Sequence, residues 1–272
     1  MASGSESVGD LVALRLDDVG AASKQHEVYG ITRIRVGALA LPFPGNLLWL
    51  KYLPPIKRWA PYPELTAAQW GEILATLAGA GARLTVAVTA GWVERDGRIV
   101  PFPVKFPAQA RALREGLDRG LLEIANHGYT HCVMEDGRFR PRLFSGNRPD
   151  HREFYDWLPE STHREHLHAA QGILGSWFGV PIETLVPPGN VLAPKTVAAA
   201  ASVGIRFISR AGGAPVGAAA GITFVDSSRV LPFHDRDVVR GGLGYLGRLL
   251  DSRRGARFAT LSELGRLQVA AR

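Results

Sequence analysis

Short apolar runs in this chain alternate with amphipathic stretches of helical length, and this alternation restricts the fold more than any other feature. The runs Leu11–Leu16, Arg83–Thr89 and Leu121–Ala125 have the length and apolar content of buried strands. The stretches Leu65–Ala80 and Pro107–Arg119 show the spacing of apolar residues expected of helices. Strands and helices that alternate in this way are typical of a parallel β/α fold.

The same order continues to the C-terminus. Further strands are expected at 182–186, 204–209, 222–225, 230–233 and 257–260, and further helices at 161–178, 194–203, 238–250 and the C-terminal end. About seven repeats with a period of about 30 residues fit a closed barrel better than an open sheet. We therefore expect one barrel domain over residues 10–272, after a small polar tail at 1–9.

Polar side chains follow several of the expected strands at the point where each strand ends. Asp17 and Asp18 follow the first strand, and His127 and His131 follow the strand that ends at Ala125. Adjacent carboxylates at a buried strand end repel each other, so a cation or a proton usually resolves the conflict. The carboxyl ends of parallel strands gather at one edge, and an Asp with two His leaves coordination positions open for water. This pattern predicts a hydrolytic metal site.

Each of these features also has a purely structural interpretation. Asp17 and Asp18 could form a turn that caps a following helix. Two histidines at this spacing are usually incidental loop residues, and only the joint pattern favours a metal. The cluster His163, His166 and His168 lies on a charged helix, and we expect it to mark the solvated face of that helix.

Five motifs occur in order along the chain. They are Leu16–Gly20, Asn126–His131, Pro187–Asn190, Leu231–His234 and Thr260–Leu264. In this order and spacing they resemble the polysaccharide deacetylases of the NodB type, also called carbohydrate esterase family 4. The resemblance spans residues 10 to 265. It implies a distorted (β/α)7 barrel that removes an acetyl group from an N-acetylated sugar.

The resemblance also implies a role for each matched residue. Asp17 would be the general base. Asp18, His127 and His131 would hold one divalent metal ion, with Zn2+ expected first and Co2+, Ni2+ or Mn2+ as alternatives. This ion would polarise the amide carbonyl and activate a water molecule whose proton Asp17 accepts.

The resemblance assigns the departing group and the substrate contacts in the same way. His234 would protonate the departing amine, and a backbone N–H near Gly189 would help to stabilise the oxyanion. The residues that we expect to contact the substrate are Pro188, Gly189, Asn190, Tyr129, Glu153 and Arg210.

Two positions depart from the family pattern. Gly128 stands where a Ser or Thr hydroxyl would orient the loop, so we expect backbone contacts to replace that hydroxyl. Val186 stands in place of an arginine that would pair with the base carboxylate, and we expect Arg210 to substitute for it. These departures indicate a divergent subgroup with its own substrate.

Composition limits the other classes of function. The net charge of +7 comes from scattered arginines without a dense basic run, so we expect no nucleic-acid partner. The apolar stretch Ala38–Leu53 is interrupted by Pro42, Pro44 and Lys51, so no membrane span is expected. The single cysteine, Cys132, and the absence of an export signal favour a cytoplasmic location. A homo-oligomer is compatible with the sequence.

Two functions remain open at the level of sequence. The first is a metal-dependent N-deacetylase that acts on a cytosolic amino-sugar precursor of a glycan or natural product. The second is a catalytically silent carbohydrate-binding or scaffold protein on the same barrel. The long insertion 24–63, which is rich in aromatic residues and proline, would form an apolar wall over the sugar or additional core.

Overall fold

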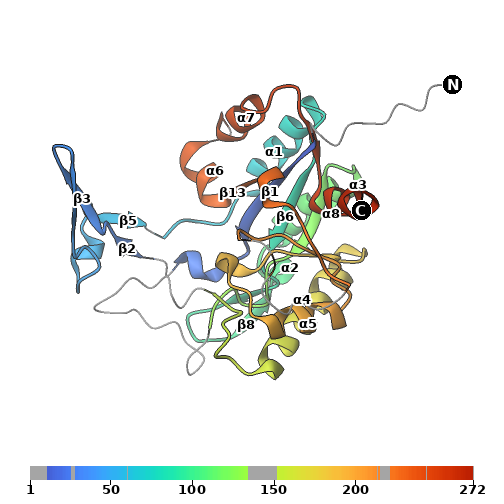
Figure 1. The fold of residues 1–272 in the computed structure, drawn as a ribbon, viewed down its shortest axis with the longest axis horizontal. Helices are drawn as coiled ribbons and strands as arrows, with labels where there is room; N and C mark the ends of the chain where they lie inside the picture. The colour runs from blue at the N-terminus through green and yellow to red at the C-terminus, as the bar shows by residue number, and fades with distance from the viewer. Residues whose placement is uncertain are drawn as a thin grey trace.

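The structure is a computed structural model that describes residues 11–25, 28–59, 61–133, 152–212, 214, 221–242 and 244–271. The predicted tail at 1–9 lies outside the described residues. Within them, parallel strands form a curled sheet with helices packed around it (Figure 1). This arrangement confirms the predicted distorted (β/α)7 barrel.

Eight parallel strands form the main sheet. In order of pairing they are β12 (Thr223–Phe224), β11 (Phe207–Ile208), β10 (Thr184–Leu185), β9 (Leu122–Asn126), β6 (Leu84–Val88), β1 (Leu11–Val19) and β13 (Val230–His234). The eighth strand, β14 (Arg257–Ala259), pairs with the first residues of β1. All strands run in one direction, so their carboxyl ends meet at one edge of the barrel.

The helices follow the strands as predicted. They are α1 (Ala67–Gly79), α2 (Phe102–Lys105), α3 (Pro107–Asp118), α4 (Glu160–Phe178), α5 (Pro194–Ser202), α6 (Asp235–Gly241), α7 (Gly244–Asp251) and α8 (Leu261–Ala270). One prediction was wrong: the single helix expected at 238–250 is two helices. Gly242 separates them because its backbone (φ 63°, ψ −177°) leaves the helical region, which glycine allows at little cost.

Side chains of β1 alternate between two cores. Leu14 and Leu16 face outward into the apolar layer between the sheet and α1, α3 and α7. Ala13 faces inward, where it packs with Ala87 and Ala125 of the neighbouring strands. Because these inner side chains are small, the first turns of α8 fit against the interior, where Leu261 and Leu264 are buried.

Residues 28–59, which we call the arm, project away from the barrel (Figure 1). The arm contains the paired strands β2 (Tyr29–Gly30) and β5 (Lys57–Trp59), the hairpin β3 (Arg33–Val36) and β4 (Leu39–Pro42), and the short helix η3 (Leu50–Tyr52). Seven of its large apolar side chains are exposed, and none of its residues belongs to the apolar clusters of the barrel core. A second small hairpin joins β7 (Gly91–Val93) to β8 (Ile99–Pro101). Within the described residues, no helix has the length and apolar character that crossing a membrane requires.

The contact between α8 and β11 gives a test of the inner core. A Cβ at Gly265 would overlap the Phe207 ring, 2.7 Å from Cε1. We expect Gly265→Ala to lower the free energy of unfolding by about 1 kcal/mol or more, because overpacking outweighs the gain in helix propensity. Chemical denaturation measures this. Gly247→Ala in α7, which has open space at that position, should be neutral or stabilising, and equal effects of both substitutions would contradict the packing argument.

Candidate functional site

A pocket lies at the carboxyl ends of the barrel strands. Its wall consists of Asp17, Asp18, His127, His131, Arg152, Pro187, Gly189, Asn190, His234 and Arg236. Apart from Arg152, these residues lie at or just after the ends of four different strands, so the curled sheet brings them together. The predicted catalytic and metal-binding residues therefore share one pocket.

The three predicted metal ligands, Asp18, His127 and His131, lie close together. Their potential ligand atoms are all within 4.8 Å of one another. Asp18 Oδ1 is 3.1 Å from His131 Nε2 and 3.4 Å from His127 Nε2. Asp18 (φ 72°) and His131 (φ 66°) both adopt left-handed backbone conformations, which are costly for residues other than glycine. Such strain is typical of positions whose side chains must point in one direction.

The hydrogen bond of His127 Nδ1 leaves its Nε2 atom suited to binding a cation. His127 Nδ1 lies 2.6 Å from the carbonyl oxygen of Val186, which can only accept, so Nδ1 carries the proton. In the neutral ring, Nε2 then presents a lone pair to Asp18 Oδ1, which is also an acceptor. A divalent ion placed among these atoms resolves the conflict, so the donor set fits a metal. His131 Nδ1 hydrogen-bonds with Ser23 Oγ at 3.0 Å, which likewise directs Nε2 toward Asp18.

Electrostatics place both residue types in the forms that bind metals. Burial lowers the pKa of His131, which favours the neutral imidazole, although the hydrogen bond to Asp18 opposes this. Burial alone would raise the pKa of Asp18. The contacts of Asp18 with His127 and His131, together with the charge of His234, outweigh that effect and hold the pKa well below its usual range. The result is a carboxylate beside a neutral histidine.

Arg15 pairs with Asp17 inside the barrel. Arg15 and Asp17 are two residues apart on β1 and therefore face the same side of the sheet. The guanidinium donates to both carboxylate oxygens, from Nε at 2.9 Å and from Nη2 at 2.8 Å. Its Nη1 atom reaches Ser209, at the end of β11, with 3.0 Å to Oγ. This bidentate contact fixes the plane of the Asp17 carboxylate at the pocket wall.

This pairing corrects the expectation for Arg210. The Arg210 guanidinium donates to the carbonyl oxygen of Ala211, and it does not contribute to the pocket wall formed by the described residues. Arg15 supplies the cationic partner of Asp17 instead. A charged residue inside an otherwise apolar strand was the signal in the sequence, because burial of an arginine requires a partner.

Glu153 is also corrected, because its carboxylate lies beneath the histidine loop and is only 2% exposed. It accepts hydrogen bonds from the backbone N–H groups of Tyr129 (2.9 Å), Thr130 (3.3 Å) and His131 (3.0 Å). It also pairs with His166 of α4. With these contacts its oxygens are occupied, so Glu153 holds the loop that carries His131 rather than contacting substrate.

Gly128 is required by this arrangement. Its φ of 82° is left-handed, and a Cβ at this position would overlap Glu153 Oε2 and lie 3.2 Å from Pro188 Cγ. The hydroxyl that we expected to be missing here is thus replaced by a carboxylate from a distant segment. The prediction of purely backbone contacts was incomplete.

His234 ends β13 and faces the pocket. Its backbone N–H donates to Asp237 Oδ2 at 2.9 Å, and its Nδ1 is 3.6 Å from the same oxygen. Burial works against the charged imidazolium, but the charge of Asp18 and the contact with Asp237 outweigh it, so the pKa of His234 is raised. A cation bound to Asp18 would cancel the effect of the Asp18 charge on the pKa of His234, whereas the contact with Asp237 would remain.

A buried ion cluster lies beside the pocket, at the base of the arm. Lys24 is 1% exposed; its ammonium donates to Glu64 Oε2 at 2.7 Å and also to Asp235. Tyr62 donates to Asp235 Oδ1 at 2.9 Å. Burial, together with the charges of Glu64 and Asp18, raises the pKa of Asp235 to about 7 against the opposing ammonium. This cluster ties the segment after β1 to the start of α6.

Two of the other four predicted substrate-contact residues line the pocket, and two do not. Gly189 and Asn190 line the pocket and both have left-handed backbones (φ 57° and 61°). Pro188 and Tyr129 are not part of the pocket wall in the described chain, and Tyr129 packs edge-on against His166. The prediction of a solvated histidine face was also wrong in part, because His166 pairs with Glu153 and His163 is buried against Thr196 Oγ1.

Sequence reasoning missed two arginines of the pocket. Arg236 lies 3.6 Å from Asp18 Oδ2, and Arg152 packs against Gly189. Arg236 follows His234 by two residues, so its place after a strand end was a usable signal. Nothing local indicates Arg152, which comes to the pocket through tertiary folding alone.

The fit between Gly128 and Glu153 gives a second test. We expect Gly128→Ala to reduce metal affinity by about tenfold or more, because it displaces the carboxylate that holds the His131 loop. Gly120→Ala is the matched control, since Gly120 also has a left-handed backbone (φ 68°) but open space around it. Metal titration and chemical denaturation would separate the two effects. Similar losses of metal affinity in both variants would mean that the Glu153 contact is unimportant.

Comparison with known proteins places the chain in a family. The sequence model described as polysaccharide deacetylase matches residues 62–208, which is more than half of the chain. No curated protein matches the sequence.

Three solved structures are similar to this one at low identity. A family 4 acetyl xylan esterase from Clostridium thermocellum, in complex with a cobalt ion, is 15% identical (TM-score 0.48; 95% of this chain and 92% of that chain covered). A family 4 carbohydrate esterase from Streptomyces lividans, in complex with acetate, is 16% identical (TM-score 0.44; 71% and 84%). A CE4 family pseudoenzyme from Bacillus anthracis is 14% identical (TM-score 0.45; 74% and 61%), so this chain spans about three fifths of its length.

The family assignment rests on the sequence model, which covers the segment from Tyr62 through the histidine motif to β11. The chain therefore belongs to the polysaccharide deacetylase family.

Proposed function

We propose that the chain is a metal-dependent hydrolase that removes the acetyl group from an N-acetylated amino sugar. The observation that supports this most directly is the convergence of Asp18, His127 and His131 beside an Asp17 that Arg15 holds in place. Membership in a deacetylase family supports the reaction class. The metal, the residue roles and the sugar are the parts that we propose.

The metal would be held by His127 Nε2, His131 Nε2 and a carboxylate oxygen of Asp18. When bound there, a divalent ion supplies Lewis acidity to the amide carbonyl and to the attacking water. Zn2+ suits a set of two imidazoles and one carboxylate, and Co2+, Ni2+ and Mn2+ are alternatives. Val186 and Ser23 orient the two rings by binding their Nδ1 atoms.

Asp17 would accept the proton of the attacking water. Its carboxylate lines the pocket, and the bidentate contact with Arg15 fixes its orientation. The backbone N–H of Gly189, on the opposite wall, would donate to the oxygen on which charge develops. A donor that is already in position costs little reorganisation at the moment of reaction.

His234 would donate a proton to the departing amine. Its raised pKa keeps the imidazolium available at a higher pH than for an ordinary histidine. The hydrogen bond to Asp237 fixes the backbone of His234 at the end of β13. Acid and base would then lie on neighbouring strands, because Asp17 and His234 are register partners.

Two arginines suggest the kind of sugar. Arg152 and Arg236 both line the pocket and add positive charge beside the histidines. An amino sugar that carries a phosphate or a nucleotide would complement that charge. A soluble precursor of a glycan or natural product in the cytoplasm remains the preferred substrate class.

The silent alternative is less well supported. It was motivated by Val186 in place of an arginine that would pair with the base. Arg15 provides that pairing from the same strand as Asp17, so the departure does not remove the partner of the carboxylate. A carbohydrate-binding protein without turnover remains the second candidate.

Substitution of the two adjacent aspartates separates their roles. We expect Asp17→Asn to retain stoichiometric metal but to lose about a hundredfold or more in turnover, since only the proton acceptor is removed. Asp18→Ala should lose the metal itself. Metal analysis after dialysis and an acetate-release screen on N-acetylhexosamines and nucleotide sugars measure both quantities.

Asp251→Asn, exposed on α7, is the control and should change neither quantity. Full metal content in Asp18→Ala would refute the ligand assignment. Full turnover in Asp17→Asn would refute the choice of base, and wild-type protein with metal but no acetate release would favour the silent alternative.

The pH profile tests His234. The rate of acetate release should fall at alkaline pH as His234 loses its proton. His234→Gln should remove this limb and lower the rate by about a hundredfold. His168→Gln, exposed on α4, should leave the profile unchanged. An alkaline limb that persists in His234→Gln would assign the acid to another group.

A further inference from the structure

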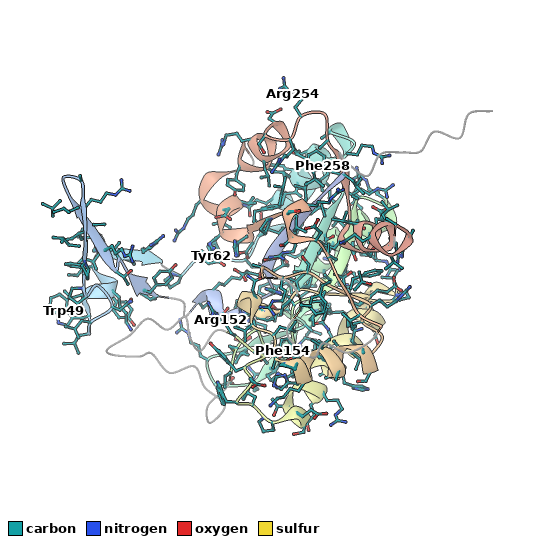
Figure 2. All side chains as sticks on the ribbon, in the orientation of Figure 1. Trp49, Tyr62, Arg152, Phe154, Arg254 and Phe258 are labelled. Carbon is teal, nitrogen blue, oxygen red and sulfur yellow. The ribbon has the colours of Figure 1, made fainter. Side chains whose placement is uncertain are left out.

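The arm, residues 28–59, exposes an unusual amount of apolar surface. Leu39 is 67% exposed, Trp49 is 62% exposed and Val36 is 58% exposed. Single exposed apolar side chains are ordinary, but a cluster of large ones usually marks a surface that binds something. Figure 2 shows Trp49 at the outer edge of the arm, on the side away from the barrel.

The register of the β3–β4 hairpin gives the arm one apolar face. Val36 pairs with Leu39, and Ile34 pairs with Leu41. Residues that pair directly, or that lie two apart on one strand, share a face of the hairpin, so these four side chains lie together. In the described part of the chain, no further strand pairs with this hairpin. Its apolar face is exposed except at Ile34, which is half-buried.

The charge of the arm selects the kind of partner. Its ionisable residues are Arg33, Arg35, Lys51, Lys57 and Arg58, and it contains no Asp or Glu. The arm therefore carries five of the seven net positive charges of the chain. Arg33 and Arg35 alternate with the apolar residues of β3 and so lie on the opposite face of the hairpin. Lys51 is buried, whereas the two arginines, Lys57 and Arg58 are exposed. Apolar surface on the same arm as these exposed charges complements an anionic lipid surface and disfavours contact with the arm of a second copy.

The base of the arm is fixed to the barrel beside the pocket. Lys24, before the arm, pairs with Glu64, after it, at 2.7 Å. Tyr62 donates to Asp235 at 2.9 Å and lies where the arm joins the barrel (Figure 2). The arm therefore leaves from the carboxyl end of β1, at the edge of the barrel that holds the pocket.

We propose that the arm docks the protein on a membrane that contains anionic lipids. Leu39, Val36 and Trp49 would enter the boundary between headgroups and acyl chains, where apolar and aromatic side chains are favoured. The hairpin would enter by its turn at 37–38, which Val36 and Leu39 flank. Arg33 and Arg35, farther from the turn on the other face, would then contact lipid phosphates. Docking would turn the pocket edge of the barrel toward the bilayer. This property is independent of the proposed deacetylase reaction and holds whether or not the site is active.

Sedimentation of the full chain with vesicles tests the proposal. We expect the protein to sediment with vesicles of phosphatidylcholine mixed with phosphatidylglycerol. Binding should be weaker to phosphatidylcholine alone and weaker at higher salt, because charge attraction to the surface is screened.

Two double variants test the two parts of the surface. Leu39→Ser with Trp49→Ser should weaken binding to the mixed vesicles by about tenfold or more, through loss of apolar burial. Arg33→Gln with Arg35→Gln should weaken it by about tenfold as well and reduce the salt dependence. An unchanged melting temperature in both variants would show that the barrel is intact.

Matched controls come from exposed residues far along the chain. Leu267→Ser with Val269→Ser removes apolar surface from α8, and Arg253→Gln with Arg254→Gln removes two exposed charges. Both controls should bind vesicles as the wild type does. The proposal is overturned if wild-type protein does not sediment with mixed vesicles or if arm variants and controls bind equally. A dimer in sedimentation velocity that the arm variants abolish, without vesicle binding, would assign the arm to self-association instead.

Discussion

Two acceptors face each other at the centre of the pocket, and the surrounding structure holds them there. His127 Nε2 and Asp18 Oδ1 are 3.4 Å apart, while the carbonyl of Val186 fixes the proton of His127 on Nδ1. This arrangement is unfavourable without a cation, and Asp18 pays a further cost for its left-handed backbone. The rings of His127 and His131 are held in place by the carbonyl of Val186, after β10, and the hydroxyl of Ser23, after β1.

Three buried carboxylates near the pocket are stabilised in three different ways. Asp17 has a guanidinium, Glu153 has backbone N–H groups, and Asp235 shares an ammonium with Glu64. Glu153 and Asp235 are bonded to segments that are distant in sequence, whereas Arg15 is on the same strand as Asp17 and extends the contact to Ser209. The ion pairs and hydrogen bonds that stabilise these buried carboxylates therefore also hold together the edge of the barrel that carries the pocket.

The barrel and the arm differ in how they are stabilised. The barrel buries its apolar residues in an outer layer against the helices and in a small inner cluster rich in alanine. The arm is held by its strand pairs and by the ion cluster at its base. Several of its large apolar side chains, such as Val36, Leu39 and Trp49, are exposed. An isolated two-stranded hairpin gains little stability on its own, so a partner surface would complete what the arm lacks.

The sequence alone determined the order of strands and helices, because periodicity and strand-end polar motifs are local properties. It also indicated which of Asp17, Asp18, His127, His131 and His234 would meet, since parallel strands must bring their carboxyl ends together. The partners of those residues were decided only by tertiary structure. Arg15 pairs with Asp17 two residues along the same strand, and only the burial of that face made the pairing necessary. Glu153 holds the histidine loop across a long stretch of sequence, which no local pattern contains. The exposure of the arm was likewise decided by the fold, since an apolar run in sequence is the same whether it is covered or not.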